Sequence, residues 1–323
     1  MQSENTSAKR TRWGEKPYYS LDYHYRELFG QKVYKIALDA SMTCPNRDGT
    51  IHDRGCIFCS NGGSGEFAMP PQDTISTQID KAIDFLQQHG KKIGNQFIAY
   101  FQSFSNTYGP VEYLEKIFTQ AMEHPSIAGL SIATRPDCFS PEVYKLLEKL
   151  QKQKPLWVEL GLQTIHESTA RFIRRGYPLA TFDACIASLR QRKIPAVAHI
   201  ILGLPGEGET EVLATINHLN QLAVDGVKIQ LLHILKGTDL AEITPPCPVL
   251  SLEEYTNLLL QCIGHLSPET VIHRLTGDGP RNLLIAPRWS LDKRHVLNHI
   301  SRAMKEQQIY QGKYYDSRDI KII

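Results

Sequence analysis

Six strand–helix units in strict alternation predict an α/β fold, in which helices cover a parallel sheet. No G-x-G-x-x-G follows the first apolar strand, which argues against a dinucleotide-binding doubly wound sheet. Polar residues directly follow several strands, at the ends that share the ligand-binding face of a β/α barrel. These observations together predict a partial (β/α)6 TIM-like barrel with short N-terminal and C-terminal extensions.

The first unit is expected to pair a strand over residues 33–38 with a helix over residues 73–88. In that helix Ile75 and Ile79 fall on one face, and Asp73 is the expected N-cap. The other strands are expected at residues 97–101, 129–134, 156–162, 196–203 and 226–235. The helices that follow them are expected at residues 111–122, 141–150, 166–174 with 181–191, 209–222 and 252–264.

The chain is expected to divide into three parts. Residues 1–16 are polar and predict a flexible tail. Residues 17–265 form the predicted barrel, and an aromatic-rich segment near its start is expected to pack over the first strand. Residues 266–323 form a C-terminal extension packed on the barrel, with a helix over residues 293–305. This extension is too short for a second catalytic domain.

Composition predicts an ordinary globular protein, because 41% of the 323 residues are hydrophobic and 22% are charged. No apolar run reaches the roughly 18 residues needed to cross a bilayer. The N-terminal segment also lacks the apolar stretch of a signal peptide. A cytoplasmic location is therefore expected, where thiols stay reduced and cysteine clusters more often bind metals or do chemistry.

The loop CPNRDGTIHDRGCIFCSNGGSG, residues 44–65, is the candidate metal-binding segment. It holds Cys44, then eleven residues, then Cys56 and Cys59. Thiolates suit both iron–sulfur clusters and zinc, but structural zinc normally takes four protein ligands. No second C-x-x-C supplies an obvious fourth. The spacing favours a four-iron cluster with one iron open to a small molecule; a zinc site and a redox-active thiol pair remain alternatives.

Five further motifs follow this loop in order: YFQSFSNTY, SIATRPDC, WVELGLQT, HIILGLPGE and GVKIQLLHILKGT. Together they resemble the radical S-adenosylmethionine (SAM) superfamily, and in particular the small bacterial branch related to the catalytic subunit of Elongator but without its acetyltransferase domain. The resemblance runs from about residue 18 to residue 314. The superfamily's commonest spacing has three residues between the first two cysteines, and longer spacings such as this one occur in the Elongator-like branch.

The resemblance implies two cofactors. Cys44, Cys56 and Cys59 would hold a [4Fe–4S] cluster whose fourth iron is chelated by SAM. The cluster would cleave SAM to a 5′-deoxyadenosyl radical, which abstracts hydrogen from the substrate. An electron donor such as flavodoxin or ferredoxin is therefore an expected partner, and no membrane is.

The resemblance also implies cofactor contacts. They are Phe58 against the adenine, Gln102 and Ser103 at the methionine amino group, Gln163 and His199 at the ribose, and Arg175 at the carboxylate or ribose.

The substrate that the resemblance implies is the wobble uridine of transfer RNA, with 5-carboxymethylaminomethyl-2-thiouridine converted to 5-aminomethyl-2-thiouridine. Such a nucleotide must leave its stack to reach the barrel mouth. Substrate contacts are expected from Arg47, Arg135, Asp137, Lys228, His233, His273 and Arg274. Two alternatives stay open. One is a radical SAM oxidoreductase that acts on a small molecule, as porphyrinogen oxidases do. The other is a non-catalytic, zinc-stabilised RNA-binding module.

Overall fold

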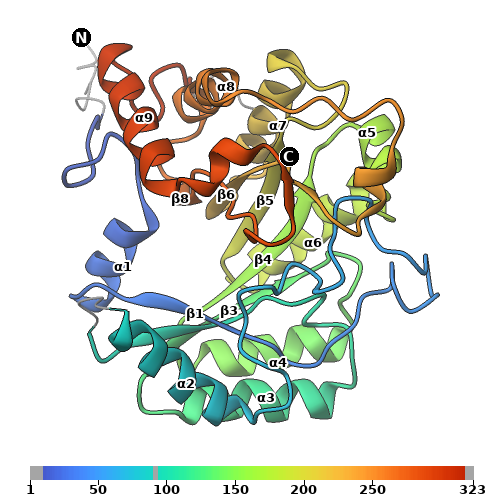
Figure 1. Cartoon of the computed structure of the whole chain (residues 1–323). Helices are drawn as coiled ribbons and strands as arrows, with labels where there is room; N and C mark the ends of the chain where they lie inside the picture. The colour runs from blue at the N-terminus through green and yellow to red at the C-terminus, as the bar shows by residue number, and fades with distance from the viewer. Residues whose placement is uncertain (1–9, 90–93, 317–323) are drawn as a thin grey trace.

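The computed structural model describes residues 10–89 and 94–316, and its centre is a curved parallel sheet (Figure 1). The strand order is β1-β2-β3-β4-β5-β6-β8, so β1 and β8 are the two ends of an open barrel. The strands are β1 Tyr34–Leu38, β2 Phe97–Phe101, β3 Ile127–Thr134, β4 Leu156–Gln163, β5 Ala196–Leu202, β6 Gly226–Leu231 and β8 Val271–Arg274. A small antiparallel sheet pairs β7 Ile234–Leu235 with β9 Leu284–Ala286.

Most of the helices follow a strand and pack on the outer face of the sheet (Figure 1). They are α1 Leu21–Phe29, α2 Ile75–Gln88, α3 Val111–Glu123, α4 Pro141–Gln151, α5 Glu167–Phe172, α6 Leu179–Gln191, α7 Glu209–Gln221, α8 Leu252–His265 and α9 Lys293–Glu306. Two short 3₁₀ helices are η1 Asp239–Glu242 and η2 Arg288–Leu291. Neighbouring helices contact one another in two series, α2-α3-α4 and α7-α8-α9. Among the described residues, no helix is both long enough and apolar enough to cross a bilayer.

The predicted partial barrel is confirmed, and it has one strand more than predicted. Val271–Arg274, which was assigned to the C-terminal extension, pairs in parallel with β6. The strand predicted over residues 226–235 instead ends at Leu231, and the chain resumes as β7. A propensity pattern cannot reveal either feature, because a short strand such as β8 depends on its neighbour for hydrogen bonds.

Two details at the N-terminal side differ from the predictions. The N-cap of α2 is Thr74, whose hydroxyl accepts a hydrogen bond from the Thr77 N–H at 3.2 Å. Asp73 instead forms an ion pair with Lys81 at 2.7 Å. In the predicted tail, Trp13 is only 2% exposed and stacks on Tyr19, so residues 10–16 are anchored. Residues 1–9 of that tail lie outside the described part of the chain.

Side chains on each strand alternate between the outer and inner faces of the barrel, as the period of two requires. The outward side chains are apolar and form one large core with the helices. On β4, for example, the outward residues Val158, Leu160 and Leu162 are fully buried. Full burial of such a side chain stabilises the fold by roughly 1.5–3 kcal/mol. The outer face therefore supplies most of the apolar stabilisation.

The inner face begins with a small apolar layer at the amino ends of the strands. Tyr25 of α1 packs there with Val33, Ile98, Trp157 and Val197. The rings of Tyr25 and Trp157 lie 5.4 Å apart between centroids. Helix α1 therefore closes the amino end of the barrel, and the carboxyl end is left for the site.

Candidate active site

The cysteine loop connects β1 to α2, which places it at the carboxyl end of the barrel. Backbone hydrogen bonds attach it to its neighbours. The Ile57 N–H donates to the Ile173 carbonyl at 3.2 Å, and the Leu240 N–H donates to the Ile57 carbonyl at 2.8 Å. The Asp239 carboxylate accepts from both Arg54 of the loop and Arg174. These contacts position a loop that has no regular secondary structure of its own.

The cysteine turn itself is tight and buried. The Cys59 N–H donates to the Cys56 carbonyl at 2.9 Å. Burial raises the pKa of Cys56 to about 12, and the neighbouring thiols of Cys59 and Cys44 act in the same direction. Burial likewise raises the pKa of Cys59. The thiols are therefore close together and protonated, and binding a metal centre there releases protons.

Unpartnered polar atoms surround this turn. Three of the buried side-chain atoms without a hydrogen-bond partner are Asn46 Oδ1, Ser103 Oγ and Gln163 Oε1. Such atoms are costly to bury unless a ligand or water satisfies them. Two glycines of the loop add to the argument, because a Cβ at Gly63 or Gly65 would overlap Phe104 or Ser103. The loop therefore lies against the strand ends, with hydrogen-bonding capacity left for a polar cofactor.

The geometry does not resemble a preformed site for a single metal ion. Within residues 10–89 and 94–316, no three His, Cys, Asp or Glu side chains are grouped so as to hold one ion. A four-iron cluster presents its ligands at separate corners and needs only three thiolates from the protein when a small molecule takes the fourth iron. The donor set of Cys44, Cys56 and Cys59 fits that group.

Four of the predicted cofactor contacts lie at this edge of the barrel. Gln102 follows β2 and donates through Nε2 to the Ser64 carbonyl of the cysteine loop. Ser103 is fully buried beside Gly65. Gln163 ends β4 with a φ of +67°, in the left-handed region that non-glycine residues uncommonly adopt. Phe58 is half-buried against the apolar cluster of Ile57 and its neighbours.

Arg175 already has several hydrogen-bond partners. Its side chain is 2% exposed, and each of its three guanidinium nitrogens already donates within the protein. The acceptors include the Tyr177 carbonyl at 3.0 Å, the Thr164 carbonyl at 2.6 Å and the Glu167 carboxylate at 3.2 Å. The structure therefore gives this arginine partners at the end of β4, in the segment after it and in α5, and its contact with a cofactor stays a prediction.

Three of the predicted substrate contacts also serve the loop. Arg47 donates to the carbonyls of Cys59, at 2.8 Å, and Ser60. Arg135 and Asp137 form a bidentate ion pair at 2.9 and 2.7 Å. Because these groups already have partners, they are better described as supports of the site than as free substrate contacts.

The other predicted residues lie inside or beside the barrel. Lys228 and His273 point into it together with His199, which was predicted to face the ribose. His233 Nε2 lies 3.1 Å from Ser290 Oγ of η2, and Arg274 lies 3.5 Å from Asp278.

A ring of polar side chains crosses the barrel interior above the apolar layer at its amino end, and we call it the interior ring. Every strand of the barrel contributes one member: Lys35, Tyr100, Ser131, Glu159, His199, Lys228 and His273. Glu159 is the centre, since its carboxylate contacts Lys35, Ser131, His199 and Lys228. The prediction missed Lys35 and Glu159, although each is a charged residue in an otherwise apolar strand, which is the signal that could have revealed them.

Burial and neighbouring charges shift the pKa values of the ionisable groups in the ring. Burial alone would raise the pKa of Glu159, but the charges of Lys228 and Lys35 and the His199 hydrogen bond hold it well below its ordinary value. Burial lowers the pKa of Lys228 to about 7 despite the nearby carboxylate. Burial also lowers the pKa of His199 to about 4, so its imidazole is neutral at pH 7. The ring is thus an ionised carboxylate surrounded by cations and neutral rings.

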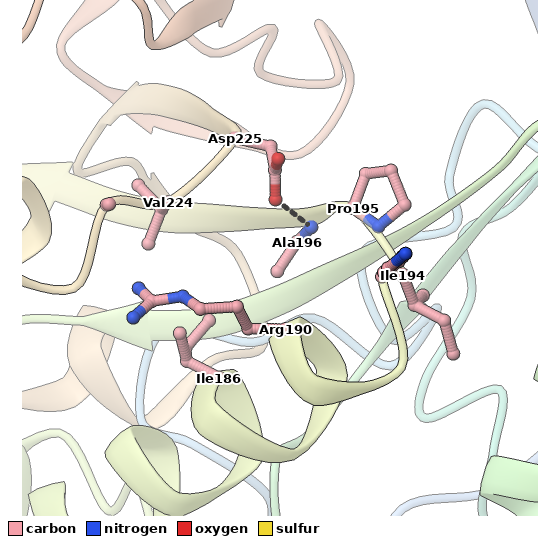
Figure 2. A pocket seen from close by; sticks show the side chains of 9 residues that line it. Ile186, Arg190, Ile194, Pro195, Ala196, Val224 and Asp225 are labelled. Atoms are coloured by element: carbon pink, nitrogen blue, oxygen red, sulfur yellow. Dashed lines mark hydrogen bonds between the residues drawn. The ribbon is translucent and has the colours of Figure 1, made fainter.

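One well-formed cavity lies away from this site. Its volume is about 220 Å³, and Arg190, Ala196 and Asp225 are among the residues that line it (Figure 2). It adjoins the amino ends of β5 and β6, the edge opposite the cysteine loop. The Asp225 carboxylate there accepts a hydrogen bond from the Ala196 N–H at 2.8 Å, so it has a structural partner (Figure 2).

Sequence comparisons place the chain among known proteins. The family described as "Radical SAM superfamily" matches residues 50–219, and "Radical_SAM C-terminal domain" matches residues 224–306. The chain is 42% identical over 303 residues to the Bacillus subtilis protein YtqA, which covers 93% of this chain and 94% of that one. It is 34% identical over 284 residues to the Escherichia coli protein YhcC, covering 87% of this chain and 90% of that one.

A structural comparison agrees with the fold. The archaeal Elp3 of Methanocaldococcus infernus superposes with a TM-score of 0.65 at 16% identity. The match covers 86% of this chain but only 64% of that protein, so the two share a fold over part of the longer chain. The chain therefore belongs to the radical SAM superfamily, whose members use a [4Fe–4S] cluster and SAM, and it fits the small Elongator-like bacterial branch.

Proposed function

We propose that this radical SAM enzyme acts on the wobble uridine of transfer RNA, and that it shortens a 5-carboxymethylaminomethyl group to 5-aminomethyl on 2-thiouridine. The observation that carries this proposal is the arrangement of the barrel interior. Three partly buried thiols lie at the carboxyl edge, and below them a cationic ring faces the same interior. The Elongator-like fold supports a transfer RNA substrate, and the ring supports a substrate with a negatively charged side chain.

Cys44, Cys56 and Cys59 would hold the cluster, and Asn46, Ser103 and Gln163 have polar atoms free to meet SAM. When bound, the cluster and SAM supply a radical that removes a hydrogen atom from a carbon that acid–base chemistry cannot activate. The chain's own contribution is to position both groups and to exclude water. The Asn46 amide donates to Cys56 Sγ at 3.4 Å, which orients that thiol.

The reaction balances as follows. The methylene carbon between nitrogen and carboxylate loses one hydrogen atom, and the adjacent nitrogen stabilises the carbon radical. A one-electron acceptor of the flavodoxin or ferredoxin class takes one electron, which leaves a protonated imine. Water adds to the imine carbon, the carbon–nitrogen bond breaks, and glyoxylate and the 5-aminomethyl amine are released.

The decisive experiment compares transfer RNA from a wild-type strain and a deletion strain by liquid chromatography and mass spectrometry of the nucleosides. The deletion strain is expected to accumulate 5-carboxymethylaminomethyl-2-thiouridine and to lack the 5-aminomethyl form. An unchanged wobble profile would remove the proposed substrate. In that case the reconstituted enzyme would still cleave SAM, and a small-molecule substrate would become the better proposal.

A further inference from the structure

The interior ring has more positive than negative charge. Glu159 contributes one carboxylate, and both Lys35 and Lys228 contact it directly. In the described part of the chain, neither lysine has a second carboxylate within ion-pair distance. The Arg274 guanidinium adds a positive field that lowers the pKa of Lys228 further, after burial and Lys35. With the histidines neutral and both lysines protonated, the ring carries one positive charge that no residue compensates; because the pKa of Lys228 is about 7, a bound anion would favour its protonated form.

An uncompensated buried charge is expensive, often by several kcal/mol. A protein commonly keeps such a charge where a ligand of opposite sign completes it. The ring is nearly dry but not sealed, because the side chains of Lys35, His199 and Lys228 are 15%, 12% and 8% exposed. Glu159 beneath them is 0% exposed. The cations are therefore the part of the ring that a ligand can reach.

Some of the inward positions directly above the ring carry small residues. The next inward positions toward the cysteine loop are small on three strands: Ala37, Ala133 and Gly161. Ala37 and Gly161 are partly exposed although they lie within the sheet. Their outward neighbours Leu38 and Leu160 are fully buried. On these three strands, therefore, no bulky side chain lies between the ring and the carboxyl edge.

We infer that the interior ring is the binding site for the carboxylate of the substrate, held by the ammonium groups of Lys35 and Lys228. The inference rests on the proposed function and identifies which end of the modified side chain enters the barrel first. Lys35 and Lys228 lie three residues before the ends of their strands at Leu38 and Leu231, a distance of roughly 10 Å along a strand. A carboxylate anchored there presents the adjacent methylene carbon toward the cysteine edge.

The charge count favours a carboxylate over a phosphate. One uncompensated positive charge balances one carboxylate, whereas a phosphate dianion would leave the buried ring negative. The Tyr100 hydroxyl accepts from Lys228 at 2.9 Å and is itself hydrogen-bonded to the Glu159 carboxylate. Lys35 contacts Ser131 Oγ at 3.1 Å, and that hydroxyl donates to Glu159. The ring therefore offers a ligand charge-assisted hydrogen bonds from two ammonium groups.

The test compares two probes on the reconstituted full-length protein under anaerobic conditions. They are the nucleoside 5-carboxymethylaminomethyl-2-thiouridine and its methyl ester, which differ in the negative charge and in one methyl group. Wild-type protein is expected to bind the acid about 10- to 100-fold more tightly by calorimetry, as expected for hydrogen bonds to a charged group. Lys228→Met and Lys35→Met should each remove most of this preference. Lys149→Met is the matched control, because Lys149 lies on the outer surface and pairs with Glu115.

Equal affinity of wild-type protein for acid and ester overturns the inference, and so does a preference that survives in both lysine variants. The comparison of acid and ester on wild-type protein can overturn the inference by itself, even if a lysine variant fails to fold. Turnover of transfer RNA separates the two proposals. Turnover by wild-type protein without a preference for the acid removes only the carboxylate site. A clear preference without turnover removes only the wobble reaction.

Discussion

The outward and inward faces of the same strands differ in almost every physical property. On β4 the outward Leu160 is fully buried in an apolar core, while the preceding inward residue, Glu159, is equally buried among charges. The outer face contacts helices, whereas the inner face contacts other strands, α1 and, at the carboxyl edge, the cysteine loop. The contrast teaches that one strand serves two purposes through a period of two: stability outside and chemistry inside.

The largest expected effect lies at the inner edge. Cys56→Ala should abolish iron–sulfur absorption and 5′-deoxyadenosine formation, because the cluster loses one of its three protein ligands. The free energy of unfolding of the metal-free protein should change by less than about 1 kcal/mol, since the residue lies on a loop outside the main core. Visible spectra measure the iron–sulfur absorption, product assays measure 5′-deoxyadenosine formation, and urea titration measures the free energy of unfolding. Retained iron content and product formation in the variant would contradict the cluster assignment.

The outer face should show the opposite pattern. Phe118 of α3 is fully buried, and its ring meets that of Phe101 at a centroid distance of 5.0 Å. Phe118→Ala should lower the free energy of unfolding by about 3–5 kcal/mol, because it removes buried apolar area and leaves a cavity. Denaturant titration measures the loss, and Phe118→Leu should lose less. An unchanged acid-over-ester preference in folded protein would confirm that the two faces are separable.

Removing the ring's carboxylate tests the inner face directly. Glu159→Gln leaves two buried ammonium groups without their shared partner and should destabilise the fold by about 3–5 kcal/mol. The double variant with Lys228→Met should recover part of that loss, because it also removes one of the stranded charges. A double-mutant cycle by denaturant titration measures the coupling. Strictly additive losses would mean that the two residues do not stabilise each other.

The smallest expected effect is a dependence of stability on pH. Burial lowers the pKa of His233 to about 4, while Asp278 opposes and Arg274 assists that shift. Its ordinary pKa in the unfolded chain is about 6.5, so between pH 6.5 and 4 the unfolded state binds more protons. Stability should therefore fall as the pH falls through this window, by at most about 3 kcal/mol from this residue.

His233→Gln should make the free energy of unfolding less steep between pH 6.5 and 4, as followed by denaturant titration at several pH values. His199 and His273 have pKa values shifted in the same direction by burial, so part of the slope should remain. These groups face the barrel interior or its rim, and the outer apolar core contains none of them. An identical slope in the variant would mean that His233 titrates normally in the folded protein.

Much of this architecture could be predicted from local pattern. The alternation of apolar strands and periodic helices identified six of the seven barrel strands, and the spacing of Cys44, Cys56 and Cys59 indicated the cluster loop. These predictions succeeded because each pattern involves residues that are near one another in the chain. Arg175 shows what such patterns leave out: its motif position implied a cofactor contact, and the structure adds partners among neighbouring carbonyl groups.

The sequence by itself determined the fold class, the alternation of strands and helices along the chain, and the loop that carries the thiols, because periodicity and cysteine spacing are local properties. Only the tertiary structure decided that Lys35 and Glu159, 124 positions apart, share one hydrogen bond. It also decided that β8 extends the sheet and that Lys228 completes the ring. Such contacts depend on strand register and sheet curvature, which arise from the packing of the whole barrel and are not encoded in any single segment.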